Sequence, residues 1–480
     1  LITTMSIYFI GLKIGKIDIN TKEIAKKEED RTKKKEIKNK AKRRKKWLVA
    51  IAVIINFGML IYLKYFNFLA SNINGLFNMI KIPIEVPFKE ILLPLGISYY
   101  TLQSISYIVD VYRGKYLPEK HFGKLALFVS FFPQLVEGPI GRYDELGHQL
   151  YEPHQFNYER AKFGVQLMLW GYFKKIVIAD RAAMFVNEVF ANYSNYFGIP
   201  IFVAAALYTI QIYAEFSGCI DIVRGTAQIF GITMAENFKR PFFSKSVQEF
   251  WRRWHITLGT WFKDYIFYPI SFSKVTQNIT AFSKKILKTS YIAKLIPVIF
   301  ALFFVWFGNG IWHGASWKYI CYGLYYYVIM VLGMLFEPLM NKIINLLKIN
   351  KEVFSYRLMQ MVRTTVFVII GMLLFRSSDL ESFWRMFTGI FTRTNLEMIS
   401  NGKLFAIGLT QSDFIIIIIG VLIMFVVGLL QERGHKLRKE ISKQNLPFRW
   451  MLYYSIIFAI IIFGIYGQGY VASDFIYGQF

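Results

Sequence analysis

The sequence predicts an all-α, polytopic membrane protein with about ten to twelve membrane helices. Of the 480 residues, 55% are hydrophobic and 18% are aromatic, and the mean hydropathy is +0.36. Soluble globular proteins are usually about 45–50% apolar, and aromatic side chains in these numbers are typical of membrane interfaces. No long soluble stretch interrupts the apolar runs, which predicts one membrane domain rather than several soluble ones.

The charge of the chain is strongly positive, with a formal net charge of +26 at pH 7. Lysine and arginine collect in cytoplasmic loops and beside anionic headgroups, so contact with membrane lipids accounts for this excess. The basic residues are spread between apolar spans and no nucleic-acid-binding module is visible, so we expect no nucleic acid partner. Cys219 and Cys321 lie in apolar sequence, which predicts packing residues rather than a disulfide or zinc site.

Three regions are expected along the chain. Residues 1–15 are apolar but shorter than the roughly 20 residues of a full span; they predict a truncated N-terminal membrane helix rather than a cleaved signal peptide. Residues 16–46 are the only clearly hydrophilic block, which predicts a basic cytoplasmic linker, either a solvated helix or a disordered loop. Residues 47–480 predict a single transmembrane domain.

The expected spans of this domain differ in regularity. Trp47–Ala70 is a clean apolar run, whereas Phe88–Tyr112 is interrupted by Pro94 and Gly96. Lys124–Ile140 ends in prolines, glycines and an acid, which predicts a broken or re-entrant segment lining a cavity or buried by protein. Further spans are expected at about Arg160–Ile178, Pro200–Phe216, Tyr291–Gly310, Ile320–Phe336, Arg363–Phe375, Phe414–Leu430 and Leu452–Ile465.

The segment Asn237–Pro269 is too polar for a simple span. Its mixture of aromatic and charged residues predicts an amphipathic or half-inserted helix near the cytoplasmic face, with His255 aimed inward. Glu249 and Arg253 are four residues apart and are expected to pair. Pro269 is expected to end the helix.

The histidines His255 and His313 are the main functional signal. Each lies in apolar, aromatic sequence, the first in Phe-Trp-Arg-Arg-Trp-His and the second in Gly-Ile-Trp-His-Gly-Ala-Ser-Trp. Polar side chains are costly in hydrocarbon, so an intramembrane histidine marks a functional site by default. Imidazole is also suited to moving a proton near neutral pH. The pair predicts proton-transfer chemistry within or at the edge of a membrane.

Two interpretations of His313 are open. As a functional group it is a general base, or a donor to a developing oxyanion, with Asn309 and Ser316 able to orient the ring. As a structural residue it bonds to a helix carbonyl. The adjacent glycines Gly310 and Gly314 allow close backbone approach, which favours the functional interpretation.

The cations around His255 also have two interpretations. Arginine binds phosphate through its planar fork, so Arg252, Arg253 and Lys263 suit a phosphorylated acyl carrier such as coenzyme A. Equally, these side chains can extend to lipid headgroups. The acids Glu215 and Asp221 lie beside a helix break, where they face either a cavity or the membrane interface.

Other catalytic or ligand-binding motifs are missing from the sequence. The histidines have no metal-binding spacing, no GxxxxGK[ST] stretch could cradle phosphates, and no serine stands in a nucleophile elbow. We therefore expect no metal and no bound cofactor, and a covalent acyl-enzyme is not indicated.

Several stretches in combination resemble one known family. They are residues 96–101, 132–140, 250–258, 261–266 with Pro269, 312–317 and the ending 474–480. At these residues the chain is similar to the membrane-bound O-acyltransferase family, in particular its bacterial alginate O-acetyltransferase branch. The branch usually carries an Asp, Phe/Tyr, Ser, Gly, Tyr, Ser/Thr, Asp pattern near its middle. Residues 215–221 follow it at Phe216, Ser217, Gly218 and Asp221, but Glu215, Cys219 and Ile220 depart from it.

The resemblance implies a helical bundle around a central funnel or tunnel in a bacterial plasma membrane. It implies that an acyl group, expected to be acetyl, passes from a cytosolic thioester donor such as acetyl-CoA to an acceptor on the other side. His313 matches the family's catalytic histidine and His255 its second motif histidine. The candidate substrate-binding residues are Arg252, Arg253, Trp254, Lys263, Asp264, Asn309, Trp312, Ser217, Asp221 and Gln134.

The resemblance also implies partners. The acceptor is expected to be a polysaccharide or cell-wall polymer, reached directly or through an extracytoplasmic, hydrolase-like acetyltransferase. Relatives include peptidoglycan O-acetyltransferases and teichoic acid D-alanyltransferases, and D-alanyl transfer from an acyl carrier protein is the alternative. A lipid-linked sugar transporter would suit broken helices equally well but should show repeat symmetry, which the sequence lacks. A non-catalytic scaffold is the remaining alternative.

Overall fold

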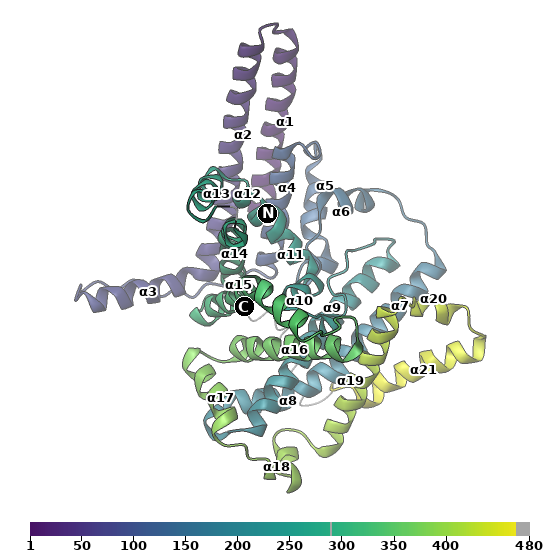
Figure 1. Cartoon of the computed structure of the whole chain (residues 1–480). Coiled ribbons are helices and arrows are strands. Elements are labelled where there is room, and N and C mark those ends of the chain that lie inside the picture. Colours follow the sequence, from purple (N-terminus) through teal and green to yellow (C-terminus); the bar gives the residue numbers. More distant parts are fainter. Residues whose placement is uncertain (289, 467–480) are drawn as a thin grey trace. The chain divides into compact units, whose positions relative to one another are not determined.

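The computed structural model describes residues 1–288 and 290–466, and within these residues the chain is helical and contains no β-strand (Figure 1). One isolated antiparallel bridge joins Phe238 to Trp254. The predicted all-α architecture is confirmed. The ending 474–480, which contributed to the family resemblance, lies outside the described residues.

The chain divides into two compact units. The first comprises Leu1–Tyr158 with Ala227–Ala235, and the second comprises Glu159–Thr226 with Glu236–Phe480. Both catalytic histidine candidates belong to the second unit, whereas Gln134 belongs to the first.

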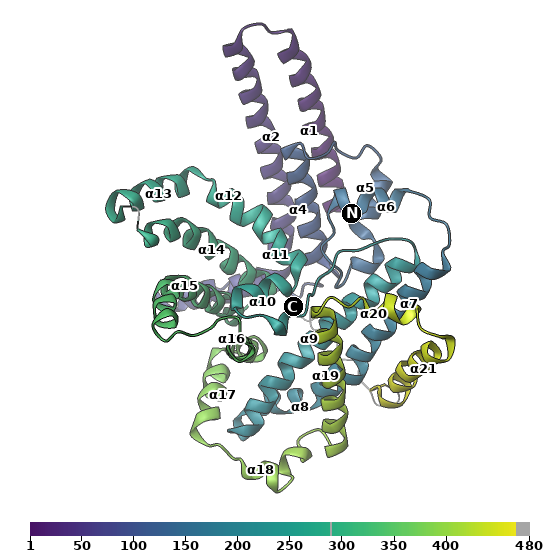
Figure 2. The ribbon, with the colours of Figure 1, turned by 45° about the vertical axis from the view of Figure 1, so that its right-hand side comes forward.

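The first unit is built around two long antiparallel helices, α1 (Ile2–Lys27) and α2 (Arg31–Leu60), which lie side by side (Figure 2). The Asp30 side chain caps α2 by accepting from the Thr32 backbone N–H at 2.7 Å. Residues 16–46, expected to be a basic linker, are thus helical except at the turn between the two helices. The π turn η1 (Ile61–Tyr65) continues α2 into α3 (Phe66–Met79).

Shorter helices complete the first unit. The segment expected to be broken, Lys124–Ile140, is helical only as far as Ser130, followed by a single 3₁₀ turn. Gln103 Nε2 and Gln134 Nε2 both donate to the Phe128 carbonyl, at 2.9 and 3.0 Å, near the end of that helix. The elements are α4 (Ile97–Arg113), α5 (Phe122–Ser130), η2 (Phe132–Gln134) and α6 (Tyr143–Tyr151).

The second unit holds most of the helices. Its elements are α7 (Tyr158–Tyr172), η3 (Phe173–Ala179), α8 (Asp180–Ala191), η4 (Tyr193–Asn195), α9 (Ile199–Ile229), η5 (Pro241–Phe243), α10 (Val247–Arg253), α11 (Ile256–Phe262), η6 (Lys263–Phe267), α12 (Tyr268–Ser271), α13 (Lys274–Leu287), α14 (Tyr291–His313), α15 (Trp317–Leu346), α16 (Phe354–Arg376), α17 (Leu380–Thr392), α18 (Glu397–Ser400), η7 (Lys403–Ala406), α19 (Gln411–Glu432), α20 (Leu437–Ser442) and α21 (Leu446–Phe463).

Seven helices in the described residues are long and apolar enough to cross a membrane. They are Arg31–Met79, α9, α14, α15, α16, α19 and α21. The predicted number of ten to twelve also included shorter or interrupted elements: Phe88–Tyr112, for example, contains the 17-residue helix α4. A polytopic membrane protein is therefore confirmed, and its membrane segments differ in length and continuity.

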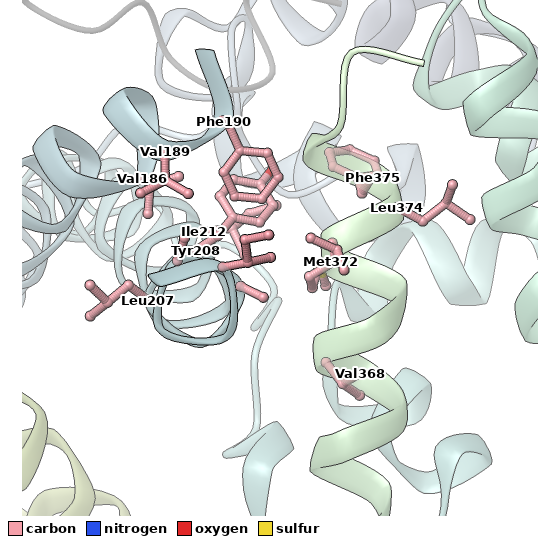
Figure 3. Close-up of a cluster of buried hydrophobic side chains, with 14 of the residues drawn as sticks. Val186, Val189, Phe190, Leu207, Tyr208, Ile212, Val368, Met372, Leu374 and Phe375 are labelled. Carbon is pink, nitrogen blue, oxygen red and sulfur yellow. The ribbon is translucent and has the colours of Figure 1, made fainter. Parts of the chain in front are cut away.

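The hydrophobic core of the second unit lies where α8, α9 and α16 meet (Figure 3). Val186 and Phe190 from α8 pack with Tyr208 from α9 and Met372 from α16, and all four side chains are buried. Phe375, at the end of α16, belongs to the same cluster and contacts the His313 ring, with ring centroids 5.1 Å apart. The core thus reaches the candidate site.

Two glycines bring α14 and α15 into backbone contact. A Cβ atom added at Gly310 would lie 2.5 Å from the Tyr319 carbonyl oxygen, and one added at Gly323 would lie 2.2 Å from the Trp306 carbonyl oxygen. Small residues permit such close approach between membrane helices. This contact fixes the end of α14, which carries His313.

Replacing Gly323 with leucine should destabilise the α14–α15 pair, because the new side chain collides with backbone rather than with a mobile side chain. Overpacking of this kind typically costs about 1–3 kcal/mol, so we expect a lower melting temperature in detergent. Gly333 lies on the same helix with no atom within 4 Å of an added Cβ, and Gly333→Leu is the matched control. Equal melting temperatures for the two variants would contradict this account of the contact.

Candidate active site

His255 lies at a break between two short helices. The expected continuous helix over Asn237–Pro269 is wrong: α10 ends at Arg253, and α11 starts at Ile256. His255 adopts a left-handed backbone conformation, with φ 45° and ψ 54°, which costs a non-glycine residue roughly 1–2 kcal/mol. Pro269 does not end the helix either, because α12 continues directly from the π turn η6 and runs on to Ser271.

Asn237 explains why the helix breaks at this point. Its backbone carbonyl accepts from the Ile256 N–H at 3.0 Å. Its side-chain Oδ1 accepts from the Thr257 N–H at 3.0 Å and from Thr257 Oγ1 at 2.9 Å, and it lies 3.1 Å from His255 Nδ1. These bonds begin α11 and offset the backbone strain at His255.

The same bonds determine the tautomer of His255. A backbone N–H can only donate, so the Asn237 atom facing Thr257 must be the oxygen, and His255 Nδ1 must carry the hydrogen that it donates. The lone pair of the neutral ring is then on Nε2. Burial lowers the pKa of His255 to about 3, because desolvation disfavours the charged ring. His255 is therefore neutral across the physiological pH range.

His313 is the last residue of α14 and is 4% exposed. Its ring centroid lies 4.9 Å from that of Trp312, 5.7 Å from that of Tyr322 and 5.1 Å from that of Phe375. The glycine after it is required, because a Cβ atom at Gly314 would lie 2.4 Å from the Tyr319 ring. The close approach expected of the glycines near His313 is thus present.

Both histidines line one cavity of about 380 Å³. One wall is a face of α14, on which cavity residues recur at helical spacing from Leu302 to His313, a length of about 16 Å. The opposite wall comes from α10 and α11. The Trp312 ring contacts both histidine rings, with centroids 5.8 Å from His255 and 4.9 Å from His313. The lining residues are Gln248, Trp251, Arg252, Trp254, His255, Ile256, Leu258, Gly259, Thr260, Phe262, Lys263, Leu302, Val305, Trp306, Asn309, His313 and Met330.

The predicted cations divide into two groups. Arg252 and Lys263 line the histidine cavity and are exposed. Arg253 does not line it: its guanidinium binds Glu249 at 2.7 Å and Glu432 at 3.0 Å. The expected pairing of Glu249 with Arg253 is confirmed, and it directs Arg253 to carboxylates rather than to the cavity.

Ser217 and Asp221 line a second cavity of about 500 Å³. Lys174 Nζ donates to Ser217 Oγ at 2.9 Å and to Asp221 Oδ2 at 2.8 Å. Asn237 also lines this second cavity while it holds His255 in the first. One asparagine therefore stands between the two groups of candidate residues.

The remaining candidates are placed elsewhere. Trp254 and Asn309 line the histidine cavity, and Asn309 is 8% exposed. Asp264 is half-buried on η6 and lines neither of these two cavities. Gln134 binds the Phe128 carbonyl in the first unit. The described residues contain no group of three or more His, Cys, Asp or Glu that could hold a metal ion.

Sequence reasoning overlooked a buried group of lysines on η3. Lys175 Nζ lies 2.5 Å from Asp180 Oδ1 and 3.5 Å from Glu215 Oε1, and both lysines, 174 and 175, are buried. The signal was present, because two adjacent lysines interrupt the apolar run Arg160–Ile178 and intramembrane charges mark functional or structural sites. Asn237 had no comparable signal, because its sequence neighbourhood is an ordinary polar loop.

Comparison with known proteins places these residues in a family. The model of the membrane-bound O-acyltransferase family matches residues 120–282. The chain is 31% identical to the probable alginate O-acetylase AlgI of Pseudomonas syringae pv. tomato over 80% of this chain and 64% of that protein. It is 31% identical to the peptidoglycan O-acetyltransferase of Helicobacter pylori, over 58% of this chain and 53% of the relative.

A third relative acts on a different polymer. The teichoic acid D-alanyltransferase of Bacillus subtilis is 29% identical over 51% of this chain and 59% of its own length. The chain spans less than two thirds of the length of each of these three relatives. The family match and the extent of these similarities show that the chain belongs to the membrane-bound O-acyltransferase family.

Proposed function

We propose that this protein is a membrane O-acyltransferase. It passes an acyl group, most simply acetyl, from a cytosolic thioester donor to a hydroxyl group of a cell-envelope polysaccharide or to an extracytoplasmic partner. The observation that carries the proposal is the shared cavity: two buried histidines from separate elements, His255 and His313, line one space between apolar helices. A structural role for either ring would not require both to line the same cavity.

The two rings have different roles in this proposal. His313 accepts the proton of the acceptor hydroxyl as its oxygen attacks the thioester carbonyl carbon. The carbon–sulfur bond then breaks, and the leaving thiolate takes the proton back from His313, so that the ring is regenerated. His255 is neutral with its lone pair on Nε2, so it orients a substrate N–H or O–H by accepting a hydrogen bond.

The positive charges at the edge of the cavity indicate that the thioester donor carries phosphate groups. Arg252 and Lys263 supply exposed positive charge beside the histidines, and phosphate groups of a coenzyme A or phosphorylated carrier thioester would bind there. Arg253 is excluded from this role because Glu249 and Glu432 hold it. No metal or bound cofactor takes part in the proposed reaction.

The class of acceptor is supported by the relatives. Their names refer to alginate, peptidoglycan and teichoic acid, which are all polymers of the bacterial envelope, so we place the protein in the plasma membrane. The Bacillus subtilis relative supports a second candidate function, D-alanyl transfer from a carrier-protein thioester. An extracytoplasmic, hydrolase-like partner would complete transfer if a hydroxyl group of that partner is the first acceptor of the acyl group.

Replacing His313 with alanine should abolish acyl transfer, because it removes the base that accepts the hydroxyl proton. Removal of a positioned acid–base group typically costs about 10²–10⁴-fold in rate. Single-turnover transfer by protein in lipid would measure this loss, with His148→Ala as the control because that histidine is exposed in the other unit. Full acylation by a folded His313→Ala variant would exclude the proposed role.

Replacing Arg252 and Lys263 with glutamine should raise KM for the thioester and leave kcat nearly unchanged, because these cations bind the distant phosphates and not the reacting carbon. A lost charge-assisted hydrogen bond is worth about 1.5–3 kcal/mol, or more than ten-fold in affinity. Steady-state kinetics of the double variant would measure the change. An unchanged KM would mean that the two side chains serve lipid headgroups.

Radiolabelled acetyl-CoA should transfer its label in a manner that depends on His313. The control is the same lipid-embedded protein supplied with a D-alanyl-loaded carrier protein. Activity with the carrier alone would move the assignment to D-alanyl transfer. Absence of transfer from both donors, with an acceptor polymer present, would contradict acyltransfer by this chain alone.

A further inference from the structure

The first unit carries a cationic helical hairpin, and most of its positive charges form no ion pair within the described structure. Residues 31–46 of α2 contain eleven Lys or Arg residues and a single acid, Glu36. Among the described residues, only one of these eleven, Lys45, forms an ion pair, with Asp18 of α1 at 2.6 Å. Most of the others are exposed.

Lysine recurs at every fourth position of this helix: Lys34, Lys38, Lys42 and Lys46. We call these four residues the lysine stripe. Side chains four residues apart are neighbours on a helix surface, so like charges at this spacing destabilise the helix by about 0.2–0.5 kcal/mol per pair. Packing against α1 offsets little of this repulsion, because the buried side chains along this part of the hairpin are the small residues Ala25 and Ala41. The stripe therefore does not serve the stability of the hairpin itself.

The hydrophilic part of the hairpin extends well beyond the apolar part of α2. The apolar part of α2 begins at Trp47, and the Lys45 ammonium lies over the Tyr112 ring at 5.6 Å, one residue before α4 ends. α1 and α2 continue past that level (Figures 1 and 2). A helix rises about 1.5 Å per residue, so Lys34 lies about 18 Å along the axis from Lys46.

Anionic headgroups cannot neutralise the distal part of the stripe. The polar layer on one side of a bilayer is roughly 5–8 Å thick, and charges are screened beyond about 8 Å at physiological salt. Lys46 can reach this layer, whereas Lys34 and Lys38 lie beyond it even if the helix is tilted by about 20°. The excess of positive charge assigns the hairpin to the cytosol.

We propose that the lysine stripe is a docking surface for an acidic protein of the cytosol. The match is one of charge: a row of carboxylates about 18 Å long would neutralise the stripe and relieve its internal repulsion. This surface lies in the first unit, so the proposal is independent of the histidine cavity and of acyl transfer.

The test uses the full chain in nanodiscs of zwitterionic phosphatidylcholine, with poly-L-glutamate as the acidic polypeptide probe. The stripe variant replaces Lys34, Lys38 and Lys42 with glutamine, which retains helix-forming composition. Exposed ion pairs are worth about 0.2–1 kcal/mol each, so the loss of three should lower the affinity roughly three- to 150-fold. Circular dichroism of both proteins would establish that the helices persist.

A matched control distinguishes binding at the lysine stripe from binding that depends only on the net charge of the protein. It replaces Lys284, Lys285 and Lys342, which are exposed lysines of the second unit, with glutamine, so the net charge changes equally. Unchanged affinity in this control supports docking at the stripe. Equal losses in the two variants would overturn the proposal, because binding would then follow net charge alone.

A second readout tests the competing role at the membrane. Trypsin cleaves after lysine and arginine, so the exposed hairpin should be cut rapidly in phosphatidylcholine nanodiscs and protected by poly-L-glutamate. Nanodiscs of anionic phosphatidylglycerol should give no comparable protection. Full protection by phosphatidylglycerol without the polypeptide would mean that the hairpin lies on the lipid surface, and the docking proposal would fail.

Discussion

The arrangement of the candidate site depends on one side chain, Asn237. Its Oδ1 atom accepts hydrogen bonds from the backbone and hydroxyl of Thr257 and from the ring of His255. Full burial makes each of these bonds costly to lose, since no water can replace them. The same atom therefore determines where α10 gives way to α11, which nitrogen of His255 carries hydrogen, and how that ring faces the cavity it shares with His313.

Buried ion pairs elsewhere in the second unit also fix how its helices are placed. Lys174 and Lys175 bind acids on α8 and α9, and Arg181 binds Asp413 and the Phe463 carbonyl oxygen, near the end of α21. Burying such pairs gains little net stability, because desolvation offsets the attraction. Losing one partner is expensive, however, so these pairs favour one relative placement of the helices over nearby alternatives.

Much of this structure could be read from local sequence. The apolar runs predicted the long helices, and the aromatic context of His255 and His313 marked both rings, because burial of an ionisable group needs a reason that is visible in its immediate neighbours. The break at His255 could not be predicted, since it depends on Asn237, eighteen residues earlier in the chain. The separation of Arg253 from the cavity likewise depends on Glu432, which is distant in sequence.

The π turn η3 makes the packing of α7 and α8 sensitive to the number of residues between them. A π turn accommodates one extra residue in an otherwise α-helical path. Loss of one residue between Phe173 and Ala179 would rotate α7 by about 100° relative to α8. Gly171, whose added Cβ would lie 2.5 Å from the Gly218 carbonyl oxygen, would then turn away from α9. Among natural variants of this chain, changes in the number of residues in this segment should therefore be rare.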